Sequence, residues 1–88
     1  MINLIIETLE EFKAHEIVNI ELTGKSAIAD YMLVASGTSS RQVTAMAENL
    51  MTRLKQSGIK PINAEGLNFG DWVLIDSGDI IIHLFRPE

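Results

Sequence analysis

The chain has 88 residues and is 47% hydrophobic, which fits one domain, residues 1–88, with a packed core. It contains no cysteine, so disulfides and thiolate metal sites are excluded. Its net charge of −5 argues against binding a nucleic-acid backbone as the main function, and no apolar run approaches the ~20 residues that span a membrane.

One helix and two strands are predicted in the first part of the chain. From residue 3 to about residue 15, apolar side chains recur at three- and four-residue spacing, which predicts an amphipathic helix. Residues 17–22 alternate between apolar and polar side chains, which indicates a strand. Residues 31–35 are apolar without alternation, a pattern typical of an inner strand covered on both faces.

A second helix is predicted to follow a Ser/Gly/Thr turn. Ser39 and Gln42 have the spacing of a capping box, in which each side chain satisfies an orphan backbone amide at the helix start. Gly58 supplies a left-handed stop, and Pro61 discourages continuation. Residues 59–64 are expected to form a strand, and Pro61, which cannot donate a ladder hydrogen bond, favours the edge of the sheet.

The last two strands are predicted at residues 72–76 and 79–85, joined by the two-residue loop Ser77-Gly78 of a tight hairpin. The predicted order is α-β-β-α-β-β-β, and its central strand–helix–strand unit implies a right-handed parallel crossover. We therefore expect an α/β fold of α+β character, in which two helices accompany a mixed five-stranded sheet.

A nucleotidyltransferase-like enzyme is the catalytic alternative, because a strand, a Ser/Gly turn, a helix and acidic strands follow one another. Such enzymes hold two metal ions on a closely spaced carboxylate pair. Strand alternation places Asp71 and Asp76 on opposite faces. Asp76 and Asp79 bracket a hairpin turn, where acids are common for local reasons. The sequence therefore predicts neither a catalytic metal pair nor a metal cofactor.

His83 and Trp72 each allow two interpretations. His83 alternates with Ile81 and Phe85 on the last strand, where a lone histidine is more often a hydrogen-bonded structural residue than a base or a ligand. Trp72, the single tryptophan, begins a strand among acidic residues. It is either a large core side chain or the anchor of a binding interface.

Acidic residues concentrate towards the end of the sequence. Residues 65–88 hold five acids and one base, whereas residues 41–60 hold four bases and one acid. This distribution is either ordinary solvated surface or an acidic patch for a basic partner.

Several blocks of the sequence closely resemble one known family. They cover nearly the whole chain and are found at residues 26–32 (SAIADYM), 35–43 (ASGTSSRQV), 65–66 (EG), 72–76 (WVLID) and 78–85 (GDIIIHLF). The resemblance is to the ribosomal silencing factors, also called the RsfS or Iojap family.

This resemblance implies a fold similar to that of nucleotidyltransferases without their catalytic carboxylates. It implies binding to the large ribosomal subunit through its fourteenth protein, on the face that meets the small subunit. A protein bound there blocks subunit joining and represses translation under nutrient limitation, which requires no catalysis and no cofactor. It also implies that the free protein can form a homodimer. Because no signal-peptide pattern is visible, we expect a cytoplasmic location.

Carried over residue by residue, the resemblance gives a partner-binding surface made of Asp30, Tyr31, Trp72, Asp76, Asp79 and His83. The acids would meet lysines and arginines of the partner, and the aromatic side chains would anchor the patch. The alternative function remains a small nucleotidyltransferase-like enzyme with a degenerate metal site.

Overall fold

The computed structural model describes residues 2–24, 29–59 and 63–87. The expected mixed sheet with two helices is confirmed, and so is the order of the elements. These are α1 (Ile2–Glu11), β1 (His15–Glu21), β2 (Tyr31–Ser36), α2 (Ser40–Gln56), β3 (Asn63–Glu65), β4 (Trp72–Asp76) and β5 (Ile80–Phe85).

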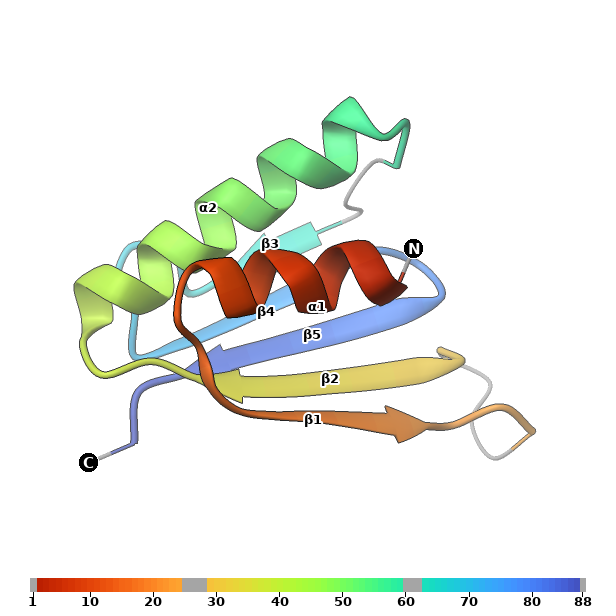
Figure 1. Cartoon of the computed structure of the whole chain (residues 1–88), viewed down its shortest axis with the longest axis horizontal. Helices are drawn as coiled ribbons and strands as arrows, with labels where there is room; N and C mark the ends of the chain where they lie inside the picture. Colours follow the sequence, from red (N-terminus) through yellow and green to blue (C-terminus); the bar gives the residue numbers. More distant parts are fainter. Residues whose placement is uncertain (1, 25–28, 60–62, 88) are drawn as a thin grey trace.

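The five strands lie in the order β1-β2-β5-β4-β3 (Figure 1). Only β2 and β5 pair in parallel, and the other neighbouring strands are antiparallel. Helix α2 connects β2 to β3, and these two strands therefore run in the same direction with β5 and β4 between them. Helix α2 packs against β4 and β5. As expected, β3 is an edge strand, whereas Pro61 lies outside the described residues.

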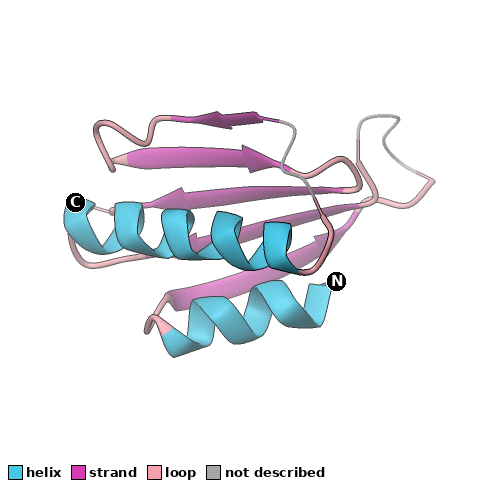
Figure 2. Ribbon diagram, turned by 90° about the horizontal axis from the view of Figure 1, so that it is seen from above, coloured by secondary structure: helices cyan, strands magenta, loops and turns pink. Residues whose placement is uncertain are grey.

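Both helices lie on the same side of the sheet (Figure 2). Their apolar stripes and one face of the sheet form the core, because alternate residues of a strand point to the same side. Within the described part of the chain, no helix is long and apolar enough to cross a membrane. The fully buried large side chains include Ile5, Leu9, Leu33, Val43, Met46, Leu50, Leu54, Val73, Ile75, Ile82 and Leu84.

The expectation that β2 is covered on both faces is wrong. β2 is an inner strand, but its Met32 and Val34 point away from the helices and are only half-buried. Both helices pack on the side of Leu33 and Ala35. The unbroken apolar run therefore reflects a sheet whose second face is apolar without a helix among the described residues to cover it.

The first helix ends earlier than predicted, at Glu11 rather than near residue 15. Lys13 takes a left-handed conformation with φ of 62°, and the amide of Ala14 donates to the carbonyl of Leu9 at 2.9 Å. This is the geometry of a Schellman stop, with lysine in the position that glycine usually takes. The second helix ends in the same way at Gly58, as predicted, with φ of 84°.

The predicted capping box of α2 is half confirmed. The Ser39 hydroxyl accepts a hydrogen bond from the Gln42 amide at 3.1 Å. The reciprocal half is wrong, because the Gln42 side chain accepts from the Thr38 amide and donates to the carbonyls of Phe12 and Lys13. Gln42 thus ties the end of α1 to the start of α2.

The final hairpin is confirmed, but its loop has three residues, Ser77 to Asp79, rather than two. The Asp76 carboxylate accepts from the Gly78 amide at 2.9 Å, and Gly78 has φ of 88°. The Asp79 carbonyl accepts from the amides of Asp30 and Tyr31. The Ser77 amide donates to the Ile80 carbonyl at 3.0 Å and closes the turn around Gly78 and Asp79, so Asp79 lies in the turn and not in the ladder between β4 and β5.

Candidate docking surface on the open sheet face

The sheet face opposite the helices is called the open face below. Its members follow from the strand register and from alternation with residues buried under the helices. Paired strands place Val18 opposite Val34, Leu74 opposite His83 and Trp72 opposite Phe85. The open face comprises Val18 and Ile20 of β1, Met32, Val34 and the buried Ser36 of β2, Ile81, His83 and Phe85 of β5, Trp72, Leu74 and Asp76 of β4, and Asn63 and Glu65 of β3.

Apolar side chains dominate the open face from β1 to β4. Val18 is 48% exposed, Ile20 37% and Trp72 57%. Large exposed apolar patches with a polar rim are typical of interaction sites, whereas isolated exposed apolar residues need no explanation. The contiguity of these residues over four strands makes the open face the candidate site.

Trp72 stands on this face and not in the core, so the interpretation as a core residue is wrong. Its indole ring stacks on Phe85, with ring centroids 5.3 Å apart and planes 26° apart. Its Nε1 donates a hydrogen bond to Nδ1 of His83 at 3.2 Å, and the two rings meet edge to face. Trp72 is thus exposed and held in one orientation.

His83 lies in the middle of the open face on the central strand β5. Burial lowers the pKa of His83 below its ordinary value of 6.5, because the apolar surroundings disfavour the charged imidazolium. The expected interpretation as a hydrogen-bonded residue agrees with its contact to Trp72.

The predicted acidic residues Asp30, Asp76 and Asp79 lie together at the end of the sheet opposite to Trp72. Asp30 and Asp79 are joined through the Asp30 amide and the Asp79 carbonyl at 2.8 Å, and Asp76 ends β4 beside them. Trp72 begins the same strand, about 13 Å away at about 3.3 Å per residue. Tyr31 belongs to neither group, since it lies on the same face of β2 as Leu33 and Ala35 and packs against the core.

Most of the apolar residues of this face are absent from the surface predicted from the sequence. The available signal was the strand at residues 31–35, which is apolar on both sides although only two helices are predicted to cover the sheet. The missed residues are Val18, Ile20, Met32, Val34, Leu74, Ile81 and Phe85.

Asp71 and Asp76 point to opposite sides of the sheet, as predicted. Asp71 precedes β4 and accepts from the Ser40 hydroxyl at 2.9 Å and from Arg86 at 3.0 Å. The Ser40 hydrogen bond, followed by the Arg86 hydrogen bond, lowers the pKa of Asp71. In the ranges that the structure describes, no three His, Asp or Glu side chains form a group that could hold a metal ion.

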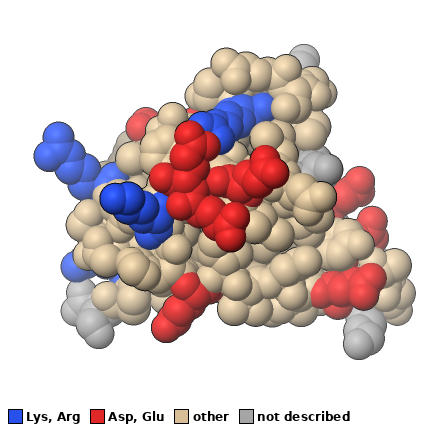
Figure 3. Space-filling model, viewed as in Figure 1, with Lys and Arg blue, Asp and Glu red and all other residues tan. Residues whose placement is uncertain are grey.

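The acids of residues 65–88 are divided among several surroundings. Glu65 belongs to the open face, Asp71 is paired with Arg86, and Asp76 binds the hairpin turn. Glu88 lies outside the described residues. A separate group of acidic side chains covers α1 on the helix side of the molecule (Figure 3), where Glu11 pairs with Arg53.

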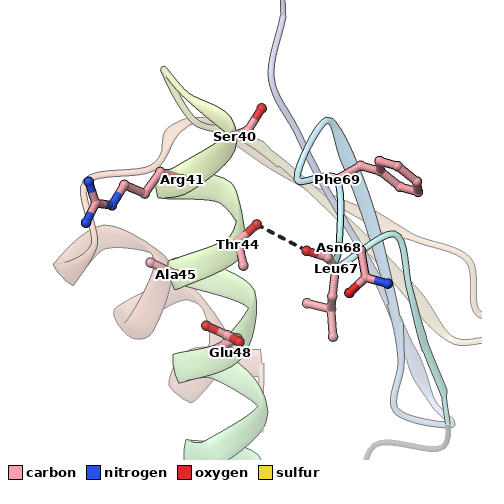
Figure 4. A pocket seen from close by; sticks show the side chains of 8 residues that line it. All are labelled: Ser40, Arg41, Thr44, Ala45, Glu48, Leu67, Asn68 and Phe69. Carbon is pink, nitrogen blue, oxygen red and sulfur yellow. Dashed lines mark hydrogen bonds between the residues drawn. The ribbon is translucent and has the colours of Figure 1, made fainter.

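A shallow groove of about 460 Å³ separates α2 from the loop at residues 66–70 (Figure 4). The Thr44 hydroxyl donates to the carbonyl of Leu67 at 3.4 Å and joins the helix to the loop across the groove. Phe69, 79% exposed, points away from α2. The lining of the groove mixes charged, polar and apolar residues.

Comparison with known proteins decides the family. A family model described as "Ribosomal silencing factor during starvation" matches residues 1–88. The chain belongs to the ribosomal silencing factor family. This name denotes a regulatory protein that acts with ribosomes.

Named relatives and a solved structure agree with the assignment to the ribosomal silencing factors. The ribosomal silencing factor RsfS of Zymomonas mobilis is 56% identical over 88 residues, which are all of this chain and 66% of that protein. The crystal structure of protein CV0518 from Chromobacterium violaceum superposes with a TM-score of 0.93 at 36% identity, over 97% of this chain and 71% of that one. A mouse protein named "Mitochondrial assembly of ribosomal large subunit protein 1" is 30% identical over 90 residues, covering 99% of this chain and 40% of that protein.

Proposed function

We propose that this protein docks through its open face onto the large ribosomal subunit, at the fourteenth protein of that subunit. The bound protein sterically blocks joining of the small subunit and so represses translation in the cytoplasm under nutrient limitation. The observation that carries the proposal is the apolar open face with Trp72 held on it. Membership of the ribosomal silencing factor family supports a ribosomal partner, and the name of the mouse relative supports the large subunit.

The open face has the dimensions of an interface centre. Strands about 4.8 Å apart and about six residues long give a five-stranded face of about 20 Å by 20 Å. A standard interface buries about 800 Å² on each partner, with an apolar centre inside a polar rim. The sheet supplies the centre, and the surrounding loops supply the rim.

Trp72 is the anchor of this interface. Tryptophan is enriched among the few residues that carry most of the binding energy of an interface. Stacking on Phe85 and the hydrogen bond to His83 already fix the ring in the free protein. Little side-chain entropy is therefore lost when a partner covers it.

Asp30, Asp76 and Asp79 form an acidic part of the rim. A ribosomal protein embedded in RNA is basic, so these carboxylates attract it and speed the encounter. Blocking by occupancy needs no bond to be made or broken. The proposed role is therefore that of a non-enzymatic binding protein.

The same face can join two copies of the free protein. A two-fold homodimer that buries both open faces removes the apolar patch from water in the absence of the ribosome. The homodimer and the ribosomal complex then exclude each other, because both use the open face.

Sedimentation of separated subunits with the purified protein tests the proposed function. We expect fewer joined ribosomes as the protein is added, with the protein migrating with the large subunit. Val18→Asp places a charge on the open face and should abolish the effect, whereas Thr52→Asp on the exposed side of α2 should not. An unchanged yield of joined ribosomes at saturating protein would show that the proposal is wrong.

A further inference from the structure

His83 is surrounded by apolar side chains on the surface where the partner is proposed to dock. Val34 of β2 and Leu74 of β4 lie directly opposite it on the two neighbouring strands. Ile81 and Phe85 precede and follow it on the same face of β5. A partner seated on the open face therefore covers the imidazole ring together with its neighbours.

The hydrogen bond to Trp72 requires the neutral form of His83. An indole N–H can only donate, so Nδ1 of His83 must accept and the single proton of the neutral ring is on Nε2. A protonated imidazole carries hydrogen on both nitrogens and has no acceptor left. Protonation therefore breaks one of the two contacts that hold the Trp72 ring in place, while the stacking on Phe85 remains.

Few charged groups of the described chain face this histidine. On β4, Asp76 is its diagonal neighbour, and its carboxylate already accepts from Gly78. On β3, Glu65 lies beyond Leu74, one strand further away. On the other side, β2 places Met32, Val34 and the buried Ser36 on this side of the sheet. At the start of β1, the titratable residues are His15, opposite Ser36, and Glu16 at the bulge that follows.

We propose that docking on the open face requires the neutral form of His83, so that protonation of His83 weakens the complex. The proposal rests on the proposed function, which it extends to the regulation of that surface. A covering partner removes the water that would solvate the imidazolium, and a basic partner repels it. The charged form also removes the hydrogen bond that helps to orient Trp72, so three effects act in the same direction.

The size of the effect follows from linkage between proton and partner binding. If the complex excludes the proton, affinity falls about tenfold for each pH unit below the pKa of His83 in the free protein. That pKa lies below 6.5 because of burial. The complex is therefore tight at neutral pH and weakens on acidification.

The proton on His83 can be followed in the free protein through Trp72, the only tryptophan of the chain. A protonated imidazole touching an indole quenches its fluorescence, so emission should fall on acidification with a midpoint below 6.5. His83→Asn, which offers an amide oxygen to Trp72, should abolish the transition, and His15→Asn should keep it. The absence of a transition in the parent protein, with the fold intact by circular dichroism, would overturn the inference.

Affinity for purified large subunits should then be measured from about pH 7.5 to pH 5.5 for the parent and both variants. The parent and His15→Asn should lose affinity in step with the fluorescence transition, whereas His83→Asn should show a flat profile. His83→Gln replaces it if the asparagine variant does not fold. If the parent binds large subunits and its affinity is as independent of pH as that of the His83 variant, the inference is wrong but the proposed function stands. No binding at any pH would contradict the proposed function and the inference with it.

Discussion

Replacing Trp72 by alanine separates the role of this residue in docking from its role in folding. The side chain is 57% exposed, so the fold hides less than half of its surface. The hidden part is about 100 Å², if the whole side chain presents about 250 Å². At about 25 cal/mol per Å², the loss in the free energy of unfolding is at most about 2.5 kcal/mol. Alanine keeps the β-carbon and the unfolded chain already buries part of this surface, so the expected loss is about 1–2 kcal/mol.

The expected loss in affinity is larger than the loss in folding stability. An aromatic residue that anchors an interface contributes about 2 kcal/mol or more, which corresponds to about 30-fold in the dissociation constant. The assays are denaturant unfolding for stability and titration of labelled protein with purified large subunits for affinity.

Phe12→Ala is the matched control for Trp72→Ala. Phe12 is a half-buried aromatic residue that packs against the core on the helix side, under the Arg53 guanidinium. It should lose a similar amount of folding stability and keep its affinity for the large subunit. The reasoning is refuted if Trp72→Ala unfolds more easily but binds like the parent, or if both variants lose affinity equally.

Three further predictions follow from contacts at turns and strand ends. Asp76→Asn with Asp79→Asn should slow association and flatten its salt dependence, and kinetic traces equal to the parent's would show that both acids serve only the turn. Gly70→Ala should destabilise the fold by more than about 2 kcal/mol in denaturant unfolding, because the φ of Gly70 is 70° and the new β-carbon would lie 2.5 Å from the Ser40 carbonyl oxygen. Gly58→Ala has similar backbone strain but open space around the new carbon, so it should lose only about 1 kcal/mol. The hydrogen bonds to Asp71 put its pKa in the folded protein below 3.8, so their stabilisation is complete above that value and is lost as pH falls through the folded pKa. Asp71→Asn should therefore lower stability at neutral pH and flatten its fall in acid unfolding; equal slopes would contradict this.

Local signals in the sequence predicted the parts of the fold that depend on neighbouring residues. The serine cap of α2 and its glycine stop need only a few consecutive residues, and both are confirmed. The end of α1 was predicted wrongly because lysine, not glycine, takes the left-handed position there. The hairpin loop was predicted one residue too short, because Asp79 lies within the turn that the Ser77 amide and the Ile80 carbonyl close.

The open face could not be assembled from the sequence because it depends on register between distant strands. Trp72 and His83 were both singled out, but their hydrogen bond follows from the pairing of β4 with β5. The same pairing separates Trp72 from Asp76 at the two ends of one strand, so the predicted surface residues form two groups. Alternation alone could have placed Tyr31 beside Leu33, under the helices, had the buried face of β2 been known.

The most direct test of the account maps which face of the protein touches the large subunit. The chain has no cysteine, so a single cysteine can carry a photo-activated crosslinker at a chosen position. A probe at position 18, on the exposed open face, should crosslink to the fourteenth protein of the large subunit, and a probe at position 52, on the exposed side of α2, should not. Crosslinks from position 52 to that protein, with none from position 18, would contradict docking through the open face.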